Sequence, residues 1–187
     1  MKCSIFVTGL TVVTLLGGCA QAAQSQPSTA VISPSALQTN GDVDIRALNL
    51  TAYGFAHYRE LQADPALAAE TVAALDYIGG QLYTSPRWVS MPSLWRLQML
   101  QARNTVRGLL GISPDVPSQA VVNTMVDLAA AYRADNQAEV SQLFTSSIFS
   151  LPPTEAAQRL VTMPYLPAVN NAATHAAQYA FGFTIPN

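Results

Sequence analysis

The stretch 93-SLWRLQMLQARNTVRGLLG-111 decides the fold, because its apolar residues recur with the spacing of an α-helix. They lie three or four positions apart, so they line one side of a helix with about 3.6 residues per turn. This apolar line consists of Trp95, Met99, Ala102, Val106 and Leu109. Glycine is a typical residue at the end of a helix. The sequence therefore predicts a helix that begins between Ser90 and Pro92 and runs to Gly111.

The same spacing occurs before and after this stretch, and it predicts further helices along the chain. The step Asp64-Pro65 marks one helix start, since Asp is a good N-cap and Pro fits the first helical position. No stretch shows the alternation of a β-strand over any length. The sequence therefore predicts an all-α fold, a small bundle of six or seven helices. The expected helices lie at 42–63, 65–82, 90–111, 121–132, 137–146, 155–162 and 165–181.

The composition favours a folded domain over a disordered chain. Half of the 187 residues are hydrophobic and 11% are charged. Disordered chains have the opposite composition, with few hydrophobic and many charged residues. The formal net charge of −2 includes no basic excess, so we expect no nucleic-acid partner. The 146 residues from Asp42 onward suit one helical domain with its own core.

The first residues are organised like the leader of an exported protein. After Lys2, residues 4–16 carry no charge and are mostly apolar. A helix needs about 20 apolar residues to cross a bilayer, so this shorter run is typical of a signal peptide. The leader ends in Leu16-Gly17-Gly18-Cys19.

This four-residue motif resembles the lipobox of bacterial lipoprotein precursors, in which the cysteine is acylated and becomes the first residue after cleavage. The resemblance implies a signal peptide over 1–18, lipidation of Cys19 and an anchor in the membrane of the cell envelope. In Gram-negative members an Asp after the cysteine marks retention at the inner membrane. Ala20 stands there, which implies the periplasmic face of the outer membrane. The alternative is an ordinary secretory signal that is cleaved between Ala20 and Ala23.

Residues 19–41 have the composition of a flexible, uncharged tether. They contain several Ser, Gln and Pro residues and no charged residue, as linkers do. We therefore expect three parts, namely the signal peptide at 1–18, the tether at 19–41 and the helical domain at 42–187. About 22 residues of flexible coil span roughly 25 Å, which would leave the domain free to reorient.

Arginines gather on the quoted helix, whereas acidic residues lie in the segments on either side of it. Arg96, Arg103 and Arg107 fall within about 40° of one another around the helix, beside Trp95. One interpretation is a surface that binds an anion or docks a partner, because guanidinium groups fit phosphates and carboxylates. The other is that these arginines lie along apolar surface and pair with the acidic segments.

The two histidines raise the question of a catalytic or metal site. His57 and Glu60 lie three positions apart on one expected helix, but a di-metal helical bundle needs several such groups from different helices. A partly buried His57 with a hydrogen-bond partner is the simpler interpretation. His175 is expected on an exposed polar face. Because the chain has neither a G-x-S-x-G pattern nor a phosphate-binding glycine loop, the sequence predicts no catalytic residue, no metal and no cofactor.

Location and the lack of recognisable catalytic chemistry together favour a non-catalytic role. We expect a membrane-anchored envelope lipoprotein that acts as an accessory or assembly factor through protein–protein contacts. The alternative is a helical module that binds a small ligand or a lipid. An enzyme that uses His57 or His175 is the less favoured third interpretation.

Overall fold

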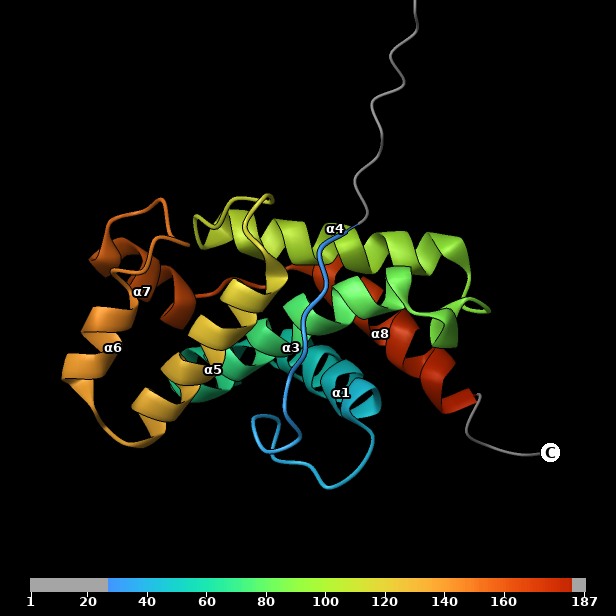
Figure 1. Cartoon of the computed structure of the whole chain (residues 1–187), viewed down its shortest axis with the longest axis horizontal. Helices are drawn as coiled ribbons and strands as arrows, with labels where there is room; N and C mark the ends of the chain where they lie inside the picture. The colour runs from blue at the N-terminus through green and yellow to red at the C-terminus, as the bar shows by residue number, and fades with distance from the viewer. Residues whose placement is uncertain (1–26, 183–187) are drawn as a thin grey trace, which may run out of the picture.

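The computed structural model describes residues 27–182, and these form helices joined by short loops (Figure 1). The predicted leader, the lipobox and Cys19 lie outside the described residues. The helices are α1 (Val43–Ala56), α2 (Tyr58–Ala63), α3 (Pro65–Thr84), the 3₁₀ turn η1 (Pro86–Trp88), α4 (Ser93–Leu109), α5 (Ser118–Arg133), α6 (Gln137–Leu143), α7 (Pro153–Val161) and α8 (Pro167–Gly182). Within the described range there is no β-strand, so the all-α prediction is confirmed.

The described residues contain eight α-helices rather than six or seven, because one expected helix is divided in two. The segment expected as a single helix at 42–63 breaks at His57, whose φ of −110° and ψ of 46° lie outside the helical region. The helix starts follow from the sequence. The Asp42 side chain accepts hydrogen bonds from the first free N–H groups of α1, and Asp64 does the same for Leu67 in α3. Both are N-caps of the expected kind.

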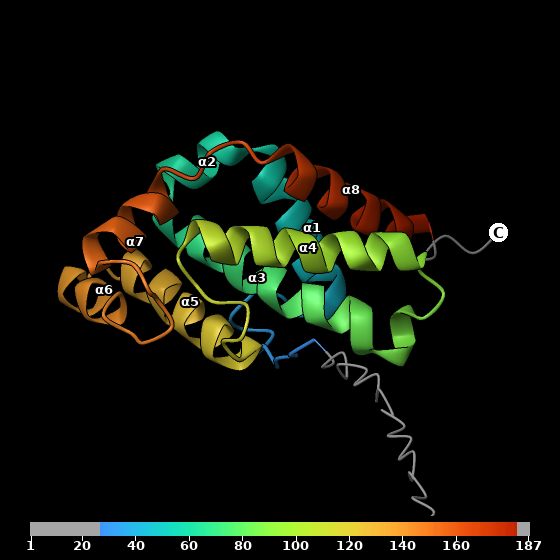
Figure 2. The ribbon, with the colours of Figure 1, turned by 90° about the horizontal axis from the view of Figure 1, so that it is seen from above.

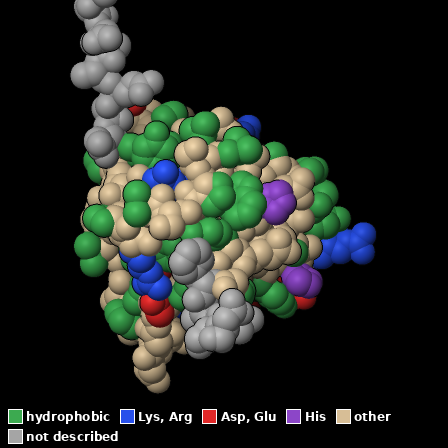
Figure 3. Space-filling model, turned by 90° about the vertical axis from the view of Figure 1, so that its right-hand side faces the viewer, with side chains coloured by type: hydrophobic (Ala, Val, Ile, Leu, Met, Phe, Trp, Pro, Cys, Tyr) green, Lys and Arg blue, Asp and Glu red, His purple; other side chains and the backbone are tan. Residues whose placement is uncertain are grey.

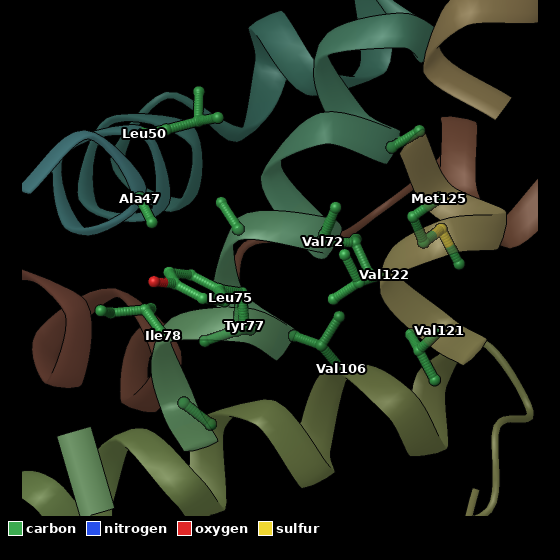
Figure 4. Packing of buried hydrophobic residues seen from close by; sticks show 14 of the residues in the cluster. Ala47, Leu50, Val72, Leu75, Tyr77, Ile78, Val106, Val121, Val122 and Met125 are labelled. Atoms are coloured by element: carbon green, nitrogen blue, oxygen red, sulfur yellow. The ribbon is translucent and has the colours of Figure 1, made fainter. Parts of the chain in front are cut away.

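The centre of the fold is α3, which is buried along most of its length. A helix that is apolar on all sides is one surrounded by others, and α1, α4 and α5 pack around α3 (Figure 2). Figure 4 shows Val72, Leu75 and Ile78 of α3 packed among buried side chains of the helices around it, including Ala47 and Leu50 of α1, Val106 of α4 and Val121, Val122 and Met125 of α5. The pair Gly79-Gly80 lets α4 and the segment with Ser28 and Thr29 come close to the α3 backbone.

Residues 27–41 pack against the helices, which corrects the predicted extent of the tether. Leu37 is completely buried, and Ala30 and Ile32 are almost so. The Ser28 carbonyl accepts hydrogen bonds from Arg103 at 2.8 Å and from the Ser118 hydroxyl at 3.1 Å. The folded unit therefore includes residues 27–41, about 15 residues before the predicted boundary at Asp42.

Helices α4 and α8 pack against each other, and α4 also packs against α3 and α8 against α1. They lie side by side and run in opposite directions (Figures 1 and 2). In the described part of the chain, no helix combines the length and the apolar character that a membrane span requires.

Candidate functional site

Two of the three predicted surface arginines are in the interior. The side chain of Arg107 is 1% exposed and forms an ion pair with Asp76 of α3, with 2.6 Å between Nε and Oδ2. Arg103 is also buried, and it binds the Ser28 carbonyl and the Ser118 hydroxyl. Burial lowers the pKa of Arg103. The predicted three-arginine surface is therefore wrong, and for Arg107 the alternative of pairing with an acidic neighbour holds.

Arg96 is different, because it has no hydrogen-bond or ion-pair partner among the described residues, whereas every other arginine has one. Its Nε is shielded from solvent and unpaired. The side chain lines an open pocket of about 450 Å³ at the junction of α3 and α4. The other residues that line this pocket are Tyr83, Ser93, Leu94 and Leu97.

The structure brings Trp95 and His175 together, although they are 80 positions apart in the sequence. Their rings stack with 5.6 Å between centroids and an interplanar angle of 26°. Tyr179 contacts the same indole edge-on at 6.0 Å. His175 is exposed, as expected, and it lies at the rim of the space between α4 and α8.

That space is a groove of about 570 Å³, which we call the α4–α8 groove. It is lined by Gln98, Gln101, Ala102 and Thr105 of α4 and by Ala168, Asn171, Ala172 and His175 of α8. The alanines keep the two helices close, and the longer side chains supply amide, hydroxyl and imidazole groups that both donate and accept hydrogen bonds. None of these lining residues is Asp, Glu, Lys or Arg.

His57 and Glu60 lie on the surface where α1 meets α2. The His57 ring stacks on Tyr53, with 4.4 Å between centroids, and its Nδ1 lies 2.9 Å from the Tyr53 carbonyl. The Tyr53 hydroxyl donates to Glu60, so this carboxylate binds Tyr53 rather than His57. His57 does have a hydrogen-bond partner, but it is exposed rather than partly buried.

Neither His57 nor His175 has a hydrogen bond to a carboxylate among the described residues. The same part of the chain contains no group of three or more His, Cys, Asp or Glu side chains placed to hold a metal ion.

Sequence reasoning missed a polar cluster that joins the start of α1 to η1. Asp44 accepts hydrogen bonds from the Tyr77 hydroxyl at 2.6 Å and from Trp88 Nε1 at 2.9 Å. Arg87 forms ion pairs with both Asp42 and Asp44, and its hydrogen bond lowers the pKa of Asp42. The only signal in the sequence was the position of Asp42 before a helix, because the partners lie more than 30 positions away.

The comparisons with known proteins add no relative, since no protein-family model, no curated protein and no solved structure matches this chain.

Proposed function

We propose that this protein is a lipid-anchored lipoprotein of the bacterial cell envelope that acts without catalysis, as an accessory or assembly factor. Its mature chain is attached to the periplasmic face of the outer membrane through an acylated Cys19. It binds a protein partner through the α4–α8 groove. The leader and the lipobox support the location, and the chemistry of the groove supports the mode of binding.

The observation that carries the binding role is the uncharged polar lining of the α4–α8 groove. The centres of protein–protein interfaces are poor in charged residues and rich in aromatic ones. Here Gln98, Gln101 and Asn171 offer amides, while His175, which stacks on Trp95, offers an aromatic ring. Amide side chains can bind both the N–H and the C=O groups of a partner's backbone. An extended or loop segment of a protein is the occupant that these groups suit.

A second candidate function is the binding of a small ligand in the same groove. Its volume of about 570 Å³ falls within the range of roughly 300–1,000 Å³ that is usual for ligand pockets. A protein partner is favoured because the groove is only partly enclosed and five of its eight lining residues are polar, whereas small-ligand pockets are largely enclosed and mostly apolar.

Site-specific photocrosslinking in intact cells tests the proposal. A benzophenone amino acid replaces Gln101 in the groove, and in a control strain it replaces Gln142, an exposed residue of α6. The proposed function predicts a discrete protein adduct from position 101 and none from position 142. In the same strain, Thr105→Arg introduces bulk and charge into the groove and should remove the adduct, whereas Ser141→Arg on α6 should not.

Equal labelling from the two positions, or no adduct from position 101, would overturn the groove as a protein-binding site. A shift in the fluorescence of a probe in the groove caused by a small-molecule extract, without any protein adduct, would support the second candidate instead.

A further inference from the structure

The described chain begins beside α4, and this fixes where the predicted lipid anchor is attached to the folded unit. Pro27 and Ser28 line a shallow pocket together with Leu100, Arg103 and Asn104 of α4. The hydrogen bonds of the Ser28 carbonyl to Arg103 and Ser118 hold this point in place. Figure 1 shows the start of the described chain crossing α4.

The distance from this fixed point to the lipid is short. Cys19 precedes residue 27 by eight positions, and eight residues span at most about 29 Å even when fully extended. A tether of 22 residues would reach more than twice as far. The side of the domain that carries Ser28 and α4 is therefore held next to the bilayer.

An exposed apolar surface lies where α3 meets the start of α4, and we call it the α4 corner. It consists of Tyr83 of α3 and of Leu94, Arg96 and Leu97 of α4, which line one open pocket. Leu94 is 59% exposed and Leu97 42%, and three of the eight large hydrophobic side chains that are exposed within the described residues belong to this surface. Figure 3 shows hydrophobic side chains spread over this end of the molecule.

The charges of the α4 corner suit an anionic surface. No Asp or Glu occurs between Asp76 and Asp115 in the sequence, so none belongs to the corner. Arg96, which has no partner among the described residues, lines the same pocket as the exposed leucines and Tyr83. A guanidinium group beside exposed leucines is the combination that binds phospholipid headgroups, because the cation meets the phosphate while the apolar side chains enter the acyl boundary.

The α4 corner is also close to the point where the anchor is attached. Leu97 and Arg103 are six residues apart, which is about 9 Å along the helix axis. The corner can therefore touch the bilayer without stretching the eight-residue connection to Cys19. The groove residues Gln101 and Thr105 lie one and two turns further along α4 than Leu97, about 40° and 80° around the helix from it, so the groove adjoins the corner.

We propose that the α4 corner docks onto the phospholipid headgroups of the bilayer that holds the lipid anchor. Leu94 and Leu97 enter the boundary between headgroups and acyl chains, and Arg96 binds a phosphate. This inference rests on the proposed acylation of Cys19. Docking fixes the orientation of the domain, whereas a long tether would leave it free.

The test uses the full mature chain with its acylated Cys19, placed in vesicles of phosphatidylethanolamine and phosphatidylglycerol. Leu97→Cys and, as the matched control, Gln142→Cys on α6 each introduce one free thiol for a bimane dye. This is possible because Cys19 is the only cysteine after the predicted leader. The dye at position 97 should be quenched by brominated lipid and shielded from iodide in the water. The dye at position 142 should show the opposite behaviour.

Two further variants test the chemistry of docking, with the dye at position 97 as the readout. Leu94→Gln should lower the ratio of docked to undocked protein by about fivefold, since it removes a partly exposed leucine from the contact. Arg96→Gln should lower docking in vesicles with phosphatidylglycerol and have little effect where phosphatidylcholine replaces it. Both side chains are partly or largely exposed, so the fold should remain intact.

Equal access of iodide to positions 97 and 142, in protein whose Cys19 carries its lipid by mass spectrometry, would overturn docking and leave the proposed function untouched. An unmodified Cys19 would overturn the anchor itself. Because the vesicles contain no other protein, quenching of position 97 by brominated lipid reports contact with lipid, whereas shielding without quenching would indicate contact between copies of the chain and would also overturn docking.

Discussion

Arg107 and Asp76 form an ion pair in the interior of the bundle, with both side chains at least 98% withdrawn from solvent. Two parallel hydrogen bonds join them, from Arg107 Nε to Asp76 Oδ2 at 2.6 Å and from Arg107 Nη2 to Asp76 Oδ1 at 2.8 Å. The remaining guanidinium nitrogen donates to backbone carbonyls of the loop that follows α4, including that of Val116 at 2.8 Å. This one side chain therefore connects α3, α4 and the loop to α5.

Asp76→Asn should destabilise the protein by about 3–5 kcal/mol, because it leaves the charge of Arg107 buried without its counter-ion. Replacing both residues, by Asp76→Leu with Arg107→Met, should cost less than the single change, since no charge is then buried. Urea unfolding followed by circular dichroism measures both values. A loss below about 1 kcal/mol for Asp76→Asn would mean that water reaches Arg107.

Leu37→Ala should destabilise the domain by about 2–5 kcal/mol, the usual loss when a buried leucine leaves a cavity. Leu37 is fully buried, although it belongs to a segment with the composition of a linker. Val31→Ala, at a side chain that is 78% exposed, is the matched control and should change stability by less than about 0.5 kcal/mol. If the two substitutions had equal effects in thermal unfolding, residues 27–41 would not be part of the folded unit.

The helices could be predicted from the sequence because their signals are local. Trp95, Met99, Ala102 and Val106 recur with helical spacing, and the caps at Asp42 and Asp64 lie next to the helices that they start. The break at His57 could not be predicted, since no proline lies nearby and the nearest glycine, Gly54, lies inside α1.

The candidate site could be predicted only in part, because its geometry depends on distant partners. Helical spacing correctly places Arg96, Arg103 and Arg107 on one side of α4, but it cannot tell which neighbour covers that side. The partners of Arg103 and Arg107 are Ser28, 75 positions away, and Asp76, 31 positions away. The stacking of Trp95 on His175 likewise follows from the packing of α4 against α8.

Residues 27–41 also show that local composition does not reveal tertiary contacts. A lack of charge and an excess of Ser, Gln and Pro are typical of linkers. Ala30, Ile32 and Leu37 nevertheless find buried positions, because the surrounding helices leave an apolar surface that only the tertiary structure reveals.

Gly111→Ala and Gly108→Ala should change stability in opposite directions. Gly111 has φ of +71°, and an added Cβ would overlap the side chain of Leu151. Strain in the left-handed region alone costs about 1–2 kcal/mol, so Gly111→Ala should destabilise the protein by at least that amount. At Gly108, near the end of α4, an added Cβ meets nothing within 4 Å, and the better helix propensity of Ala should stabilise by up to about 1 kcal/mol. Chemical denaturation of the two variants checks the signs.

Tyr77 should make the protein less stable at alkaline pH. Burial, and the hydrogen bond that its hydroxyl donates to Asp44, raise the pKa of Tyr77 well above its usual value. Above about pH 10 an unfolded tyrosine loses its proton while the folded one keeps it. The folded state then binds more protons than the unfolded state. The stability that protonated Tyr77 contributes is therefore present below pH 10 and is lost as the pH rises, by up to about 1.4 kcal/mol per pH unit.

Tyr77→Phe removes that contribution, so its unfolding free energy should fall less steeply between about pH 10 and 11.5 than that of the unchanged chain. Some decline should remain, because burial also raises the pKa of Tyr132. Identical slopes for the two proteins in urea unfolding across this range would contradict the assignment to Tyr77.

Cys19→Ser should release the protein from the membrane, although the α4 corner is unchanged. The exposed leucines and Arg96 offer only a small contact, and stable membrane binding needs a stronger or a second signal. The acyl chains supply this second signal. They keep the α4 corner at a high local concentration near the bilayer, so a weak contact is enough to orient the domain. In detergent-free extracts, the exported and cleaved variant should therefore appear in the soluble fraction. Its presence in the membrane fraction would mean that the α4 corner or a membrane-bound partner, rather than the lipid, supplies most of the affinity.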